Sequence, residues 1–184
     1  MTTTRTKMTA DDLWRMPDDG QRHELIRGAL TTMAPAGGGH GGVAGRITVA
    51  VGGHVLAKRL GEVLTADAGF LIERDPDPVR APDVAFISKD RVPAGGLPIR
   101  FIPFAPDIAV EVLSPADSQP EVDEKTNQWL AAGTAMVWIV NPLNRTVAVH
   151  RSGRDPRVLR EADTLDGQAV CPGFSVKVAE IFER

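Results

Sequence analysis

Three apolar runs along the chain predict strands that are buried inside a sheet. The run at 105–115, APDIAVEVLSP, is almost unbroken and has turn signals at both ends, which is typical of a strand covered on both faces. The runs at 81–87 (APDVAFI) and 135–140 (AMVWIV) have the same character. The pattern therefore predicts a sheet with helices packed on it.

A helical pattern follows the central run. Ser118 and Glu121 form a capping box with Pro120 in the first turn, and Gly133 marks the end of the helix. Strand, helix and strand over 107–140 have the length of a crossover unit. This length predicts that the two strands are parallel neighbours in one sheet.

The rest of the pattern predicts an N-terminal β-hairpin, a second helix and further strands. The segment HELIRGAL begins at His23 and reads as a strand that enters a turn at Gly28. The other predicted elements are a helix at 10–16 after the N-cap Thr9, a flexible glycine loop at 36–42, a helix at about 42–59, a strand at 62–72 that breaks near Gly69, a strand at 146–150, short strands near Val158 and Val170, and a helix from Val176.

Length and composition describe an ordinary globular protein. The 184 residues, 42% hydrophobic and 24% charged, are enough for one α/β domain over 1–184, with a mixed β-sheet flanked by helices and a frayed end at 1–7. The net charge of -3 provides no overall positive field, so nucleic-acid binding requires a local patch. The single cysteine, Cys171, excludes an internal disulfide framework and fits a reducing cytoplasm. We find no signal peptide or membrane-span pattern, and we expect no membrane partner.

Two carboxylates interrupt the apolar strands. Glu111 lies deep in the central run, whereas Asp107 is expected at the mouth of that strand, bordering any metal site. Asp83 interrupts the run at 81–87. An unpaired buried carboxylate costs several kcal/mol, roughly, so a cation or a hydrogen-bond network is expected beside each. Two carboxylates on neighbouring strands suit Mg²⁺ (or Mn²⁺), which takes one or two carboxylates with waters and phosphate oxygens.

Lys125 breaks the apolar stripe of the helix that follows the central strand. It lies three residues after Val122 and four before Trp129, so it points toward the sheet and can reach Glu111. A lysine beside a metal can orient or deprotonate the attacking water in phosphodiester hydrolysis. The alternative is an internal salt-bridge cluster in which Lys125 neutralises Glu111 and Asp83 caps a loop. Trp129 is expected in the core.

The motifs described above resemble those of a known protein family. The pair Pro82-Asp83 and the later Glu111 within EVLSP resemble the PD-(D/E)XK nuclease superfamily, and more narrowly the Uma-two family of endonuclease-like proteins. The resemblance covers nearly the whole chain and includes HELIRGAL, APDVAFI, PDIAVEVLSP, GTAMVWIVNP and PGFSVKVAEIF in that order. It implies a restriction-endonuclease-like core, a Mg²⁺-type cation and nucleic-acid cleavage, with DNA favoured.

The resemblance also implies roles for single residues. Asp83 and Glu111 would be metal ligands, and Lys125 would take the role of a lysine that the superfamily usually has two residues after the glutamate, where this chain has Leu113. Glu24 matches an acidic residue of the family's early hairpin, and His23 replaces the tyrosine that commonly precedes it.

Other candidates surround these residues. His40, in the glycine run, could touch substrate. Five basic residues could form a phosphate patch, or could be ordinary surface charges. They are Arg74, Arg80, Lys89, Arg91 and Arg100.

Three functions remain open from the sequence. The first is a Mg²⁺-dependent endonuclease, which we expect to act as a homodimer because cutting both strands of a duplex calls for two active sites. The second is a catalytically silent protein of the same fold that binds nucleic acid or protein. The third is a hydrolase of small phosphate esters.

Overall fold

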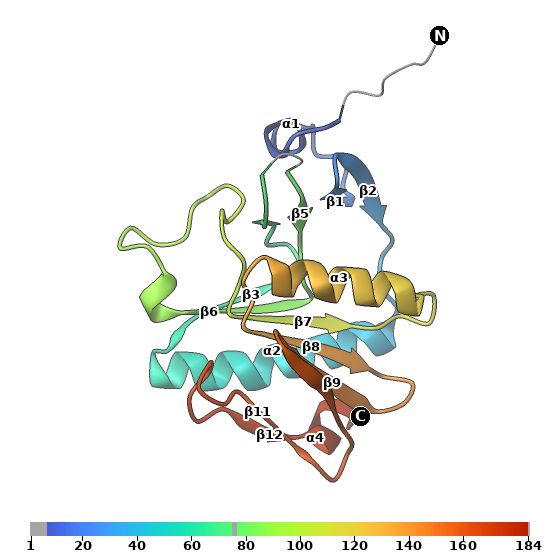
Figure 1. Cartoon of the computed structure of the whole chain (residues 1–184), viewed down its shortest axis with the longest axis vertical. Coiled ribbons are helices and arrows are strands. Elements are labelled where there is room, and N and C mark those ends of the chain that lie inside the picture. Colours follow the sequence, from blue (N-terminus) through green and yellow to red (C-terminus); the bar gives the residue numbers. More distant parts are fainter. Residues whose placement is uncertain (1–6, 75–76, 184) are drawn as a thin grey trace.

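The computed structural model describes residues 7–74 and 77–183, and its centre is a six-stranded mixed sheet (Figure 1). The strand order is β10-β9-β8-β7-β6-β3, and β7 and β8 are the parallel pair predicted for the crossover unit, whereas the other pairs are antiparallel. The strands are β3 (Gly61–Thr65), β6 (Val84–Ser88), β7 (Ile108–Val112), β8 (Met136–Asn141), β9 (Thr146–Arg151) and β10 (Arg154–Leu159).

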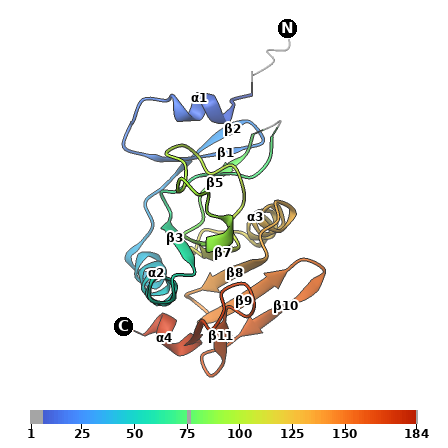
Figure 2. The same cartoon turned by 90° about the vertical axis from the view of Figure 1, so that its left-hand side faces the viewer.

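Two helices cover opposite faces of this sheet, with the central strands between them (Figure 2). Helix α2 (Gly38–Lys58) packs against one face, and α3 (Gln119–Ala131) against the other. All five residues of β7 are buried because both of its faces are covered. The predicted mixed sheet flanked by helices is therefore confirmed.

Helix α3 begins and ends where the sequence predicts. Ser118 is its N-cap and forms the capping box with Glu121, and Gly133 follows the helix with φ 96°, a conformation that suits glycine. Trp129 is fully buried against the sheet. The helix therefore has a fixed position over β7.

The predicted N-terminal hairpin belongs to a second, four-stranded sheet that lies above the main sheet in Figure 1. Its turn places Arg27 and Gly28 at φ 50° and 81°, as the left-handed hairpin turns require. The chain passes from this sheet into β6 through residues 81–83, which brings the hairpin close to the end of β7. The sheet contains β1 (Arg22–Ile26), β2 (Ala29–Met33), β4 (Phe70–Leu71) and β5 (Val79–Arg80), and α1 (Ala10–Trp14) precedes it.

The C-terminal segment packs on the α2 side of the main sheet. It contains β11 (Thr164–Asp166), β12 (Ser175–Lys177) and α4 (Val178–Phe182). In a different part of the chain, the short 3-10 helix η1 (Lys89–Arg91) follows β6. Two predictions were wrong in the C-terminal segment. Val170 lies in a turn, and Val176 belongs to β12, so the last helix begins two residues later than predicted.

The glycine run is not a loop, because α2 already begins at Gly38. Glycine costs about 1 kcal/mol in a helix, but Val43, Ile47, Val51 and Val55 are all buried along one face, and this packing outweighs the weak local propensity. The predicted strand at 62–72 splits into β3 and β4, and a side chain at Gly69 would collide with the Phe101 ring. The predicted frayed end includes residues 1–6, which are outside the described residues.

None of the helices in the described part of the chain is long and apolar enough to cross a membrane.

Candidate active site

Glu111 is buried at the carboxyl end of β7, on the face that α3 covers. Both of its carboxylate oxygens have donors. Trp129 Nε1 donates to Oε1 at 2.7 Å, and Lys125 Nζ donates to Oε2 at 2.7 Å. Lys125 and Trp129 are four residues apart on α3, so one face of this helix holds the carboxylate from both sides.

Lys125 lies between two acidic side chains. Its Nζ is 3.7 Å from Glu24 Oε1 in addition to its contact with Glu111, and its side chain is 22% exposed. Burial alone would lower the pKa of Lys125, but attraction to Glu111 and Glu24 prevails and raises it. Lys125 is therefore an ammonium in the resting protein.

Asp83 lies just before β6, not within that strand, and faces the same end of β7. Its Oδ2 accepts the backbone N–H of Val112 at 2.8 Å and lies 3.2 Å from His40 Nε2 in the first turn of α2. Burial would raise the pKa of Asp83, but the hydrogen bonds from His40 and Val112 lower it overall. The pKa of His40 is raised, chiefly by its hydrogen bond to Asp83.

Glu24 joins the small sheet to this cluster. Its Oε2 accepts from Arg80 Nη1 at 2.8 Å, and its Oε1 accepts the backbone N–H of Ala81 at 3.0 Å. Arg80 also donates from Nε and Nη2 to Gln128 Oε1 on α3, at 2.9 and 2.6 Å. Burial opposes ionisation of Glu24, but Lys125 and Arg80 lower its pKa overall.

Three carboxylates, Glu24, Asp83 and Glu111, share this site with three basic side chains, Lys125, Arg80 and His40. Burial first, and then the negative charges of Asp83 and Glu24, raise the pKa of Glu111 to about 7, despite the attraction of Lys125. Glu111 therefore takes up a proton near neutral pH although an ammonium is 2.7 Å away. An additional cation in this space would stabilise the ionised form of Glu111.

The donor set fits Mg²⁺ more closely than a metal that needs a complete protein cage. Within the described ranges, no group of three or more His, Cys, Asp or Glu residues is arranged to hold a metal ion. Mg²⁺ needs only one or two carboxylates because it keeps several waters. Asp83 Oδ1 has no donor among the described residues, and Glu111 Oε2 is held by the partly exposed Lys125, so each carboxylate has one oxygen that a cation can approach.

The structure brings together the six site residues that the sequence predicts. Asp107 is different. It lies at the opposite end of β7, where Oδ2 accepts the Ser88 N–H at 2.7 Å and Oδ1 accepts from Arg91 at 3.0 Å. The expectation that Asp107 borders a metal site was wrong, because a strand carries residues four apart to different ends of the sheet. The six residues that meet are Glu24, His40, Arg80, Asp83, Glu111 and Lys125.

Sequence reasoning missed two members of the site. Trp129 was expected in the core, where it lies, but its indole also orients Glu111. Gln128 was not considered, and it links α3 to Arg80. The role of Trp129 had a signal in the sequence, because Trp129 lies four residues after Lys125 on the strand-facing side of the helix. Nothing in the sequence indicates the role of Gln128.

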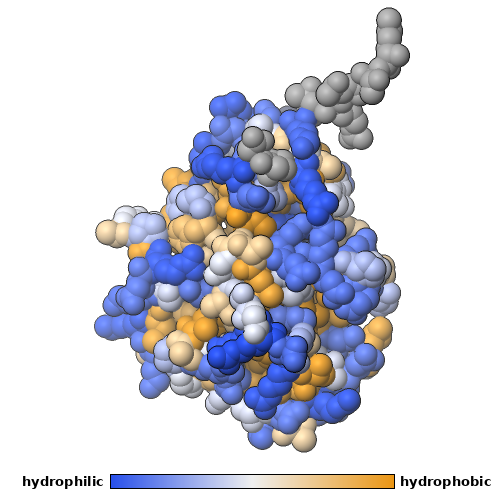
Figure 3. All heavy atoms as spheres, viewed as in Figure 1, coloured by the Kyte–Doolittle hydropathy of each residue, from blue (hydrophilic) through white to orange (hydrophobic). Residues whose placement is uncertain are grey.

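The predicted phosphate patch is largely engaged in ion pairs. Arg91 pairs with Asp107 and Arg100 with Asp11, whereas Arg80 is 6% exposed and held by Glu24 and Gln128. The side of the molecule around α3 is mostly hydrophilic (Figure 3). A role of Arg80 in binding substrate stays a prediction.

A solved structure has the same fold as this protein. The chain is similar to the crystal structure of "a putative nuclease belonging to DUF820" from Anabaena variabilis ATCC 29413, with a TM-score of 0.83 and 21% sequence identity over 95% of this chain and 97% of that one. No curated protein matches the chain. Residues 10–179 match the sequence profile of the Uma2 (Uma-two) family, described as "Putative restriction endonuclease". The match spans nearly the whole chain, and the protein is therefore a member of the Uma2 family of restriction-endonuclease-like proteins.

Proposed function

We propose that this protein is a metal-dependent endonuclease that hydrolyses phosphodiester bonds of nucleic acid, with DNA as the favoured substrate and Mg²⁺ (or Mn²⁺) as the cofactor. The observation that carries the proposal is the burial of Glu111 beside Asp83 and Glu24, which raises the pKa of Glu111 to about 7 although the Lys125 ammonium lies 2.7 Å away. A further positive charge beside a buried carboxylate stabilises the ionised form of that carboxylate. Membership of the Uma2 family supports the nuclease chemistry.

Asp83 and Glu111 are the proposed metal ligands. The Val112 N–H holds Asp83 Oδ2 in place, and the Trp129 indole holds Glu111 Oε1, so Asp83 Oδ1 and Glu111 Oε2 are the oxygens we assign to the metal. When bound there, Mg²⁺ would lower the pKa of a coordinated water and offset negative charge on the phosphoryl oxygens.

Lys125 and His40 are the proposed groups that handle protons and substrate charge. Lys125 is charged and 22% exposed, so its ammonium can stabilise the charge that develops on a phosphate during water attack. His40 lies beside Asp83 with a raised pKa, and its imidazolium form can contact a phosphate oxygen. Glu24 and Arg80 keep Lys125 in place from the other side.

The second candidate function is a catalytically silent binding protein. One observation favours it, since Lys125 and Trp129 already satisfy both carboxylate oxygens of Glu111 without a metal. In that case the cluster is a structural salt bridge of the kind that proteins keep for a specific fold. Such a protein would bind nucleic acid or another protein and would gain no stability from Mg²⁺.

Cleavage assays separate these functions. Plasmid DNA, single-stranded DNA, RNA and a small phosphate diester are incubated with the protein in Mg²⁺, Mn²⁺ or EDTA. We expect nucleic-acid cleavage with a divalent metal, none in EDTA and none from Glu111→Gln. The matched control Glu62→Gln changes an exposed glutamate of β3 and should cut like the parent. Cleavage by Glu111→Gln at the parent's rate would remove the proposed site, and hydrolysis of the small diester alone would replace the nuclease with an esterase.

We also propose that the protein assembles as a homodimer. Cleavage of both strands of a duplex needs two active sites, and two-fold dimers are the commonest assemblies. Light scattering at high protein concentration tests it, and a monomer together with double-strand cutting would contradict it. The cytoplasmic location and the single-domain organisation stay predictions from the sequence.

A further inference from the structure

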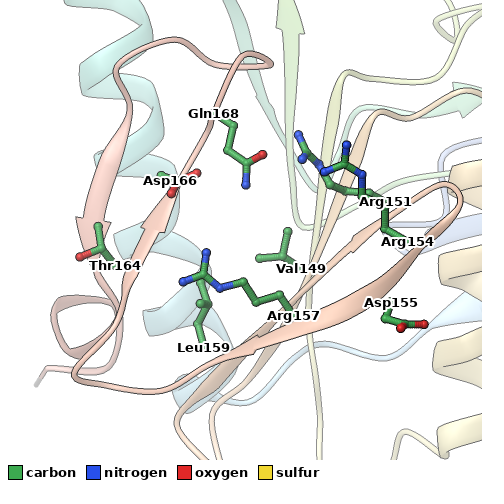
Figure 4. Close-up of a pocket in the computed structure, with 9 residues that line it drawn as sticks. All are labelled: Val149, Arg151, Arg154, Asp155, Arg157, Leu159, Thr164, Asp166 and Gln168. Atoms are coloured by element: carbon green, nitrogen blue, oxygen red, sulfur yellow. The ribbon is translucent and has the colours of Figure 1, made fainter.

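A cavity between the β9–β10 hairpin and β11 lies apart from the candidate active site (Figure 4). Its volume is about 290 Å³, close to the lower end of the range for small-ligand pockets. Val149 and Leu159 form a buried apolar floor. Three arginines line the cavity, namely Arg151, Arg154 and Arg157.

A β-bulge aims all three arginines into the same space. Arg154 pairs directly with Arg151 across the hairpin, and Arg157 pairs with Val149. Two residues of β10 therefore stand opposite one residue of β9, and without this irregularity residues 154 and 157 would face opposite sides of the sheet. Figure 4 shows Arg151 and Arg154 side by side, with Arg157 extending toward β11.

The pairing of Arg151 with Arg154 is unfavourable by itself. Like charges directly opposite each other on two strands repel, and no carboxylate of the described residues forms an ion pair with any of the three guanidinium groups. The three arginines outnumber the two aspartates of the lining, Asp155 and Asp166, and therefore leave a net positive charge beside an apolar floor. Guanidinium groups in such an arrangement match the geometry of a phosphate group.

Asp166 adds a second requirement for the ligand. It lines the same cavity from β11, and its Oδ1 is buried with no hydrogen-bond partner among the described residues. A buried acceptor without a donor is energetically unfavourable. The Asp166 carboxylate can accept a hydrogen bond from a hydroxyl or amino group of a ligand, while Thr164 and Gln168 offer further polar contacts on the same wall.

We propose that this cavity binds a phosphate ester whose phosphate meets Arg151, Arg154 and Arg157 and whose hydroxyl or amino group meets Asp166. A free nucleotide and a nucleotide unit of a nucleic acid both have this chemistry. The phosphate is not the one cleaved at the candidate active site. Arg151 follows His150 at the end of β9, and His150 pairs with Val137 near the start of β8. Glu111 pairs with Ile139, toward the other end of β8. The cavity floor also belongs to the α2 side of the sheet, opposite to α3.

Calorimetric titration in phosphate-free buffer with EDTA tests the proposal. The probes are inorganic phosphate, a nucleoside monophosphate and a short single-stranded oligonucleotide. We expect the monophosphate or the oligonucleotide to bind, and the double variant Arg154→Gln/Arg157→Gln to bind at least tenfold more weakly. The control Arg160→Gln removes one positive charge, against two in the double variant, from an exposed residue that follows β10 and does not line the cavity, so it should change affinity less than twofold.

The remaining variants separate this site from its surroundings. Asp166→Asn removes a negative charge from the wall and should strengthen binding of inorganic phosphate, while Glu62→Gln, which changes an exposed residue outside the cavity, should leave every affinity unchanged. A parent protein that binds none of the three probes overturns the proposal, and so does an Arg160→Gln variant that weakens binding as much as the double variant. Preference for the monophosphate identifies a free nucleotide as the ligand, and preference for the oligonucleotide identifies a nucleic acid.

Discussion

The indole of Trp129 donates a 2.7 Å hydrogen bond to Glu111 Oε1 inside the protein. Trp129 is fully buried and Glu111 is 6% exposed, so no water competes for this bond. It fixes one oxygen of the carboxylate and leaves the other to Lys125. A core residue thereby sets the orientation of the central residue of the candidate site.

Trp129→Phe tests the value of that hydrogen bond. The substitution leaves a buried acceptor unsatisfied, which costs about 1–3 kcal/mol beyond the lost packing. The matched control is Trp138→Phe, because Trp138 is equally buried and its Nε1 has no hydrogen-bond partner among the described residues. Urea unfolding should show the larger loss of stability for Trp129→Phe. Equal losses in the two variants would mean that the indole contributes packing alone.

The raised pKa of Glu111 predicts a pH dependence of the metal-free protein. The folded protein holds a proton on Glu111 up to about pH 7, whereas the unfolded chain releases it near 4.5. Between these values the folded state binds more protons, so this residue makes stability fall as pH rises and has no further effect above about pH 7. Relative to Glu111→Gln, the parent should lose roughly 2 kcal/mol between pH 5 and 7.5. Urea unfolding at the two pH values measures this difference, and parallel behaviour of parent and variant would contradict it.

Lys125→Met separates a catalytic lysine from a structural one. Without metal, Glu111 loses its counter-ion and stability should fall by about 2 kcal/mol, less than for a fully enclosed pair because Lys125 is 22% exposed. With Mg²⁺ bound the loss should be small, while cleavage is abolished. Lys125→Arg should also be badly impaired, because a planar guanidinium cannot replace a compact ammonium.

The measurements for Lys125 are thermal melts with and without Mg²⁺ and the cleavage rate of each variant. A Lys125→Met protein that cuts at the parent's rate would exclude Lys125 from the mechanism. A variant that stays destabilised in saturating Mg²⁺ would assign Lys125 a structural role.

Arg80→Met should destabilise the protein by about 3 kcal/mol, because it leaves Glu24 buried without its guanidinium partner. Arg100→Met is the control, since the Arg100–Asp11 pair is exposed and such pairs contribute less than about 1 kcal/mol. Urea unfolding compares the two variants. A similar, small loss in both would show that Glu24 is neutral in the folded protein.

Divalent metal should stabilise the parent. A ligand at 100 times its dissociation constant adds about 2.7 kcal/mol to the free energy of unfolding, which amounts to several degrees in Tm. Melting in Mg²⁺, Mn²⁺ and EDTA measures this shift, and Asp83→Asn should lose most of it. An unchanged Tm at all concentrations of both metals would favour the silent binding protein.

Local sequence signals were enough to predict the buried strands and both ends of one helix. Continuous apolar runs placed β6, β7 and β8 to within a few residues, because burial on both faces excludes polar residues from nearly every position. The capping box at Ser118 and the glycine at 133 determined both ends of α3, because these signals are local. The orientation of Lys125 was predictable for the same reason, because its spacing from Val122 and Trp129 alone directs it toward the sheet.

Other features depend on packing and distances between elements, which local signals do not report. Helix formation through the glycine run depends on the packing of its buried face against the sheet, and no local signal reports that packing. The contacts of Trp129 with Glu111 and of Gln128 with Arg80 join different elements, and the bulge that gathers three arginines depends on the register between two strands. Charge balance around Glu111 likewise depends on distances between four elements. A sequence contains the charges but not these distances, and the distances determine the pKa.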